Sequence, residues 1–113
     1  MKHEAKKIAK IVDEILTFFL FNYNARSEIR VEPAPHEYRI TFTFCDVDMT
    51  DEELTALRDR LSVERQPELE EYYWQLTGET DDSNEMSVVA MMCDSVHMTR
   101  DGTTVTISVV RNV

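Results

Sequence analysis

The densest group of potential metal ligands in the sequence is the acidic stretch at residues 46–52, Asp-Val-Asp-Met-Thr-Asp-Glu. Oxygen donors at alternate positions are the pattern with which EF-hand loops collect ligands for calcium. That loop also needs glycine at its sixth position and a bidentate glutamate at its twelfth, where this chain has Asp51 and Leu57. We therefore predict no metal site here, and interpret the carboxylates as the end of a strand followed by the start of a helix.

The side chains that could act as nucleophiles or bases are few and scattered. The chain contains three histidines and two cysteines, which are His3, His36, His97, Cys45 and Cys93. Covalent catalysis needs a nucleophile, a base and an orienting group that converge in space, and no spacing among these residues marks such a triad. The cysteines are also too few for a disulfide framework or a zinc site. We predict no catalytic residue and two free thiols in a reducing cytoplasm.

Length and charge restrict the class of protein. The 113 residues fit one domain, residues 1–113, which is large enough to bury a core without disulfides or metals. Acidic residues outnumber basic ones by 22 to 12, and the resulting net charge of −10 repels nucleic acid and anionic membranes. The apolar run at residues 15–21 is too short to span a membrane. The composition therefore favours a cytoplasmic module without nucleic-acid or membrane partners.

Residues 3–22 have the periodicity of a long helix. Ala5, Ile8, Val12, Ile15 and Phe19 form one apolar stripe. In the second half, residues 15–21, apolar side chains surround nearly the whole helix. This half must be buried on more than one side within the subunit or cover its extra face with a partner, so Phe18 and Phe21 are interface candidates and a homodimer through this half is an alternative.

Two strand hairpins flank the middle of the chain. Apolar and polar residues alternate over residues 28–32 and 38–44, with a turn at the proline-containing residues 33–36. Residues 96–98 and 105–109 form the second hairpin. Its turn is predicted at Asp101-Gly102, as a type I′ turn in which both positions have positive φ.

Three helices are predicted between the hairpins. The first covers residues 50–62, with Thr50 and Glu53 as a capping box and Leu54, Leu57 and Leu61 as its inner face. The last covers residues 84–94, with Asp82 and Glu85 as a capping pair. Its apolar face consists of Met86, Val89, Ala90 and Cys93.

The middle helix lies in residues 65–79, and we expect the core to be organised around it. Pro67 suits its first turn and Gly78 its C-terminal cap. Its predicted buried face consists of four residues at helical spacing: Leu69, Tyr72, Tyr73 and Leu76. Trp74 falls off this face, which makes it another interface candidate.

The resulting order is α-β-β-α-α-α-β-β. Strands in hairpins with helices between them predict an α+β two-layer sandwich, in which helices cover one face of a sheet of about four strands. The sheet is predicted to be antiparallel, with a mixed sheet as the alternative.

Two short segments and the order of elements carry a family resemblance. The segments are residues 85–92, Glu-Met-Ser-Val-Val-Ala-Met-Met, and residues 44–48, Phe-Cys-Asp-Val-Asp. The chain resembles the ATP-binding domain shared by histidine kinases and bacterial anti-sigma factor serine kinases. In that family a long helix precedes a hairpin, an aspartate ends the second strand, a variable lid follows, and a glycine-rich loop opens the helix before the last hairpin. The resemblance implies that Asp46 occupies a vestigial adenine position.

The sequence departs from the family where nucleotide would bind. The aspartate of the family belongs to an Asp-x-Gly-x-Gly box, but no glycine follows Asp46 in residues 47–50. The family holds magnesium with an asparagine four residues after a glutamate, whereas Glu14 is followed at that distance by Phe18. In place of the phosphate-binding glycine loop, residues 79–84 read Glu-Thr-Asp-Asp-Ser-Asn, whose carboxylates repel a triphosphate. Two glycines in the whole chain cannot supply two glycine boxes.

These departures predict a non-catalytic regulatory or interaction module with a degenerate ATPase fold and no cofactor. It would act by contact with a protein, and the analogy with anti-sigma factors suggests a transcription regulator as that partner. One alternative is an ATP-binding serine kinase of the anti-sigma kind, in which Asp46 reads adenine. Another is a small-molecule sensor that uses a vacated pocket between Phe18, Phe44 and the late helix.

Overall fold

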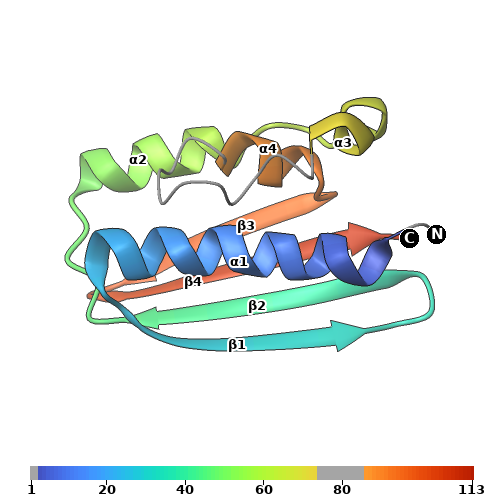
Figure 1. Cartoon of the computed structure of the whole chain (residues 1–113). Coiled ribbons are helices and arrows are strands. Elements are labelled where there is room, and N and C mark those ends of the chain that lie inside the picture. Colours follow the sequence, from blue (N-terminus) through green and yellow to red (C-terminus); the bar gives the residue numbers. More distant parts are fainter. Residues whose placement is uncertain (1–2, 74–85) are drawn as a thin grey trace.

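The computed structural model describes residues 3–73 and 86–113, which contain four helices and four strands (Figure 1). Their order along the chain is α1 (Glu4–Tyr23), β1 (Arg26–Pro33), β2 (Glu37–Cys45), α2 (Asp51–Arg60), α3 (Pro67–Tyr73), α4 (Met86–Met91), β3 (Ser95–Asp101) and β4 (Thr104–Asn112). The predicted order of elements is confirmed.

The four strands form one sheet in the order β1-β2-β4-β3, and every neighbouring pair is antiparallel. Figure 1 shows the helices gathered on one face of this sheet. The α+β two-layer architecture is therefore confirmed, with an antiparallel sheet. The last strand, β4, lies between β2 and β3, so each hairpin contributes one central strand and one edge strand.

Alternation along the two central strands separates the core from the open face of the sheet. Every second residue points toward the helices and is buried: Ile40, Phe42 and Phe44 on β2, and Val105, Ile107 and Val109 on β4. The residues between them carry hydroxyl groups and remain partly exposed: Thr41, Thr43, Thr106 and Ser108. A sheet with one apolar and one polar face requires a helical layer on the apolar face alone.

Helix α1 buries the face that carries Ile8, Ile11 and Ile15, together with both phenylalanines at positions 18 and 19. The predicted stripe was wrong at Ala5, which is exposed. Position 7 is buried instead, although it is a lysine, because its charge has buried partners elsewhere in the fold. In the described part of the chain, no helix is both long enough and apolar enough to cross a membrane.

Helices α2 and α4 follow their sequence patterns closely. The Thr50 hydroxyl accepts from the Glu53 amide and the Glu53 carboxylate accepts from the Thr50 amide, which confirms the predicted capping box. The predicted apolar faces of both helices are buried: Leu54, Leu57 and Leu61, and Met86, Val89, Ala90 and Cys93. The capping pair predicted at Asp82 and Glu85 lies outside the described residues.

The turn of the second hairpin differs from the prediction by one residue. Asp101 pairs with Thr104 at the end of the ladder, so the two central residues are Gly102 and Thr103. Gly102 has φ of 61°, and positive φ at the first central position alone is typical of a type II′ turn. The Asp-Gly pattern located the hairpin correctly but not the turn type.

Helix α3 begins at Pro67 as predicted, but the prediction of its buried face was wrong at Leu69. Leu69 is 37% exposed, whereas Glu70 is only 3% exposed. The structure describes no side chain for the other predicted members of that face, or for the predicted interface and cap residues that follow: Tyr72, Tyr73, Trp74, Leu76 and Gly78. The buried face of α3 therefore contains a carboxylate that sequence periodicity did not identify.

Candidate functional site

The most unusual feature of the helical layer is a cluster of buried charges, the ionic cluster, formed by Glu4, Lys7, Glu70 and Arg111. Lys7, Glu70 and Arg111 are all buried, although charged residues rarely are unless they are paired. The four residues come from α1, α3 and β4, and are separated by up to 107 residues in sequence. The cluster therefore joins the two ends of the chain to the short helix α3.

Arg111 is the centre of the ionic cluster. Its two terminal nitrogens each donate to one carboxylate oxygen of Glu70 at 2.7 Å, which is the planar two-point geometry that suits a guanidinium group. The Nε atom donates to Glu4, and one terminal nitrogen also donates to the Met92 carbonyl. Lys7 donates to Glu70 at 2.9 Å and to Glu71. The carboxylate of Glu70 thus accepts hydrogen bonds from two cations, and the Nε atom of Arg65 lies 3.5 Å from one of its oxygens as a third.

Paired charges determine the pKa values in the ionic cluster. Burial by itself would raise the pKa of Glu70, but hydrogen bonds from Arg111 and Lys7 outweigh it and lower the pKa to about 2. Burial would lower the pKa of Lys7, and its hydrogen bonds to Glu71 and Glu70 raise it instead. Lys7, Glu70 and Arg111 are therefore all charged at neutral pH. Because each charge is saturated by protein partners, we interpret the cluster as a structural element and not as a substrate site.

A second set of polar contacts surrounds the ionic cluster. Arg65, just before α3, donates to the Asp94 carboxylate at 2.6 Å and to the Asn112 carbonyl at 2.8 Å. Asp94 also accepts from the Asn112 amide. The Gln66 amide donates to the Met91 carbonyl at 2.9 Å. The start of α3 is thereby fixed to the end of α4 and to the last strand.

The ionic cluster makes a specific prediction for acid unfolding. The pKa of Glu70 is lower in the folded protein than the ordinary value of 4.5, so its stabilisation is fully present above that value and is lost as the pH falls toward about 2. We expect the difference in unfolding free energy between the wild type and Glu70→Gln to be constant above about pH 5.5 and to shrink below it. Urea unfolding of both proteins at a series of pH values measures this. If this difference in unfolding free energy stayed constant down to about pH 2, the charge of Glu70 would not contribute to stability, which would contradict the pairing described above.

Phe18 stands where the resemblance would place a magnesium-binding asparagine. Glu14 and Phe18 lie one helical turn apart on α1, and both are buried. Phe18 is 7% exposed, and its ring makes an edge contact with Phe19 at 5.1 Å between centroids. A hard cation needs oxygen donors, which this ring cannot supply. The residues present therefore do not fit a bound magnesium nucleotide at this position.

Asp46, the residue assigned to the adenine position, directly follows β2 and is exposed. Its φ of 62° is the left-handed conformation that aspartate tolerates better than most residues. The next residue, Val47, is buried and its amide donates to the Thr103 carbonyl at 2.9 Å. The Asp46 carboxylate is thus at the expected strand end. The next residue, however, is part of the core, and its backbone amide is bonded to the second hairpin.

The pocket expected between Phe18, Phe44 and the late helix involves rings that belong to the core. Phe44 is fully buried, and its ring stacks on Phe19 with a centroid distance of 4.0 Å. Phe18 and Phe44 therefore contact core side chains of the described residues. Phe18 was also an interface candidate, and its side chain is only 7% exposed in the folded chain. Phe21 is 64% exposed, and Trp74 lies outside the described residues.

The remaining candidate side chains are dispersed over the fold. His3 precedes α1, His36 lies in the turn between β1 and β2, and His97 lies on β3. Cys45 ends β2, whereas Cys93 is buried, and burial raises the pKa of its thiol to about 12. Such a thiol stays protonated and unreactive at neutral pH. Within residues 3–73 and 86–113, no three histidine, cysteine or acidic residues are placed to hold a metal ion.

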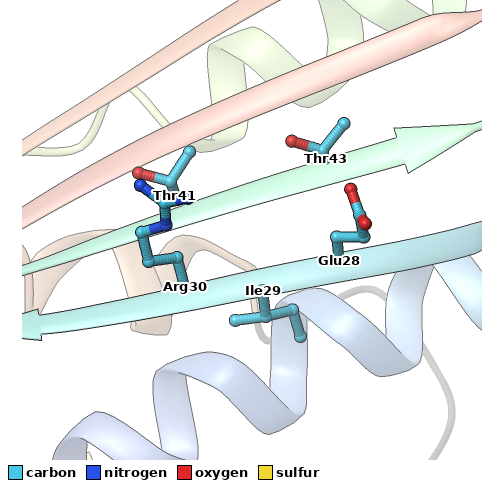
Figure 2. Close-up of a pocket in the computed structure, with 5 residues that line it drawn as sticks. All are labelled: Glu28, Ile29, Arg30, Thr41 and Thr43. Atoms are coloured by element: carbon cyan, nitrogen blue, oxygen red, sulfur yellow. The ribbon is translucent and has the colours of Figure 1, made fainter.

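A pocket of about 470 Å³ lies on the open face of the sheet and was not predicted. It is lined by five residues of β1 and β2: Glu28, Ile29, Arg30, Thr41 and Thr43. Figure 2 shows the glutamate, the arginine and the two threonines side by side on that face, while Ile29 lies toward α1. The alternation of β1 and β2 contains the signal for this surface, because it places charged and hydroxyl side chains at facing positions.

Neither protein-family models, nor curated proteins, nor solved structures give a match to this chain.

Proposed function

We propose that the protein is a non-catalytic cytoplasmic interaction module, with a degenerate fold of the histidine-kinase ATPase type, that acts by contact with another protein. The observation that carries this proposal is the burial of Phe18. Where the resembled family has a metal-binding amide, this chain has an aromatic ring packed in its core. A side chain in that environment contributes to stability and not to nucleotide binding.

The surface near the end of α1 supports an interaction role. Phe21 is 64% exposed there. Helix α2 begins with three exposed acidic residues: Asp51, Glu52 and Glu53. An exposed aromatic side chain is a typical anchor at protein interfaces, and an acidic surface favours a basic partner. A transcription regulator fits this chemistry and remains the partner class that the family analogy suggests.

Titration with ATP and a non-hydrolysable analogue, with and without magnesium, tests the loss of nucleotide binding. A ligand at about 100 times its dissociation constant would stabilise the fold by about 2.7 kcal/mol, which raises the melting temperature measurably. We expect no saturable heat and no change in melting temperature at millimolar nucleotide. Saturable binding would overturn the proposal and would favour the ATP-binding serine kinase alternative.

A further inference from the structure

The two edges of the sheet differ in how their free backbone groups are protected. At the β3 edge, Arg58 of α2 donates to the Met98 carbonyl at 3.1 Å, and Arg100 reaches the Met49 carbonyl and Asp51 on the helical side. Charges that point inward and side chains that cover the edge are devices against pairing with another chain. Strand β3 is therefore a closed edge.

Strand β1 lacks these devices among the described residues. The residues of its eight-residue span that face the helical side are uncharged: Ser27, Ile29, Val31 and the last residue, Pro33. Val31 is 42% exposed, although it is an inward-facing β-branched residue. A regular strand of this length with an apolar inner side is a template for a further strand.

The hydrogen-bonding pattern shows which backbone groups of β1 are available. The Ala34 amide donates to the Glu37 carbonyl at 2.8 Å, which closes the β1–β2 turn. Hydrogen-bonded and non-hydrogen-bonded pairs alternate along an antiparallel ladder. Counting from this bond along the register, the amide and carbonyl groups of Ser27, Ile29 and Val31 point away from β2. A new strand would pair with these residues.

The sequence of β1 is complementary to itself. We propose that two copies of the chain associate through antiparallel pairing of their β1 strands, with Ile29 opposite Ile29 of the second copy. In this register Arg26 faces Glu32 of the second copy and Glu28 faces Arg30 of the second copy, and the two-fold axis repeats both pairs. All charges on the open face of β1 then meet an opposite charge, and opposite charges at facing positions stabilise strand pairs. The register also places outward-pointing backbone groups opposite each other.

An apolar seam beside β1 favours the same arrangement. Val12, Leu16 and Leu20 follow each other at four-residue spacing along α1, and Leu20 is 44% exposed. Figure 2 shows Ile29 on the side of β1 that faces α1. Val12, Leu16 and Ile29 are only partly buried against the core, and Val31 is exposed, so both α1 and β1 carry apolar side chains that the fold does not fully cover. The two-fold axis of a continuous sheet places both α1 helices on the same side of the sheet. Each copy would then cover apolar side chains of the other.

The proposed pairing of two β1 strands is also compatible with the strong negative charge of the chain. The charged residues of β1 are two arginines and two glutamates, so the strand is neutral within a chain of net charge −10. The acidic excess lies outside the paired strands. This dimer uses the β1 edge and does not rest on the proposed function, because a dimer could form whether or not the chain binds nucleotide.

A charge exchange tests the register. Arg30→Glu creates two facing glutamate pairs, and the double variant Glu28→Arg/Arg30→Glu restores opposite charges. Within one copy, positions 28 and 30 face Thr43 and Thr41, so neither variant disturbs an ion pair of the fold. Sedimentation velocity over a range of concentrations in about 0.15 M salt, where distant charges are screened, measures the mass of each protein. Lys6→Glu, at an exposed position of α1, changes the net charge by the same amount as Arg30→Glu and serves as the control.

We expect the wild type to reach twice the monomer mass of 13.2 kDa. Arg30→Glu should raise the dimer dissociation constant about tenfold or more, the double variant should restore it, and Lys6→Glu should leave it nearly unchanged. Circular dichroism at low concentration checks that all variants are folded. A wild type that is monomeric at about 1 mM would overturn the proposal. So would a dimer that is insensitive to Arg30→Glu, equally weakened by Lys6→Glu, or not restored in the double variant.

Discussion

Replacement of Arg111 by methionine is expected to lower the free energy of unfolding by about 3–5 kcal/mol, because it removes one partner of a buried ion pair. The remaining Glu70 carboxylate would lose both hydrogen bonds from the guanidinium group. It would keep the hydrogen bond from Lys7 and the longer contact with the partly exposed Arg65. Glu4 would lose its partner as well. Methionine preserves most of the side-chain volume, so the loss reports the charge more than a cavity.

Urea unfolding followed by circular dichroism measures this loss, and Arg39→Met is the matched control. Arg39 forms an exposed ion pair with Glu37 at 3.4 Å, and exposed pairs contribute about 0–1 kcal/mol. The same substitution should therefore lower the free energy of unfolding only slightly at Arg39 on β2 and strongly at Arg111 on β4. Equal losses in the two variants would contradict the structural role of the ionic cluster.

The fold could be predicted from sequence because its signals are local. Alternation identified both hairpins, and the pairing of Thr50 with Glu53 identified the start of α2 to the residue. The order of elements then restricts the arrangement, since hairpins separated by helices leave few ways to cover one sheet face.

The buried face of α3 could not be predicted because its signal is not local. Helical periodicity selected Leu69 for the buried face. Glu70 is buried instead because it pairs with Arg111 and Lys7, which lie 41 and 63 residues away in the sequence and are invisible to a local pattern. One indication was present in β4. Arg111 continues the inward-facing series Val105, Ile107 and Val109, so the alternation of β4 places an arginine at a core position, where it requires an acidic partner.

Two features of the sequence bear on the candidate nucleotide site. The glycine count and the phenylalanine four residues after Glu14 are visible in the sequence, and the structure adds that this ring is in the core. The exposed edge of β1 was not predictable, because alternation alone does not say which strand of a hairpin is central. Only the sheet order β1-β2-β4-β3 identifies β1 as an edge strand.

Truncation of Phe19 to alanine is expected to cost about 3–5 kcal/mol of stability, whereas truncation of Phe21 should change it by less than about 0.5 kcal/mol. Phe19 is fully buried and stacks on Phe44, so its removal leaves a cavity between α1 and β2. Phe21, two residues later on the same helix, is 64% exposed. The pair thus compares the same substitution at a core position and at a surface position.

Urea unfolding of both variants at low protein concentration tests this difference, and a concentration series then separates the fold from association. The exposure of Phe21 predicts that its truncation leaves the monomer unchanged. If Phe21→Ala also weakened self-association, the second half of α1 would take part in the dimer, as its apolar sequence suggested. If Phe21→Ala were as destabilising as Phe19→Ala at every concentration, Phe21 would have to be buried within the monomer, which would contradict its position in this fold.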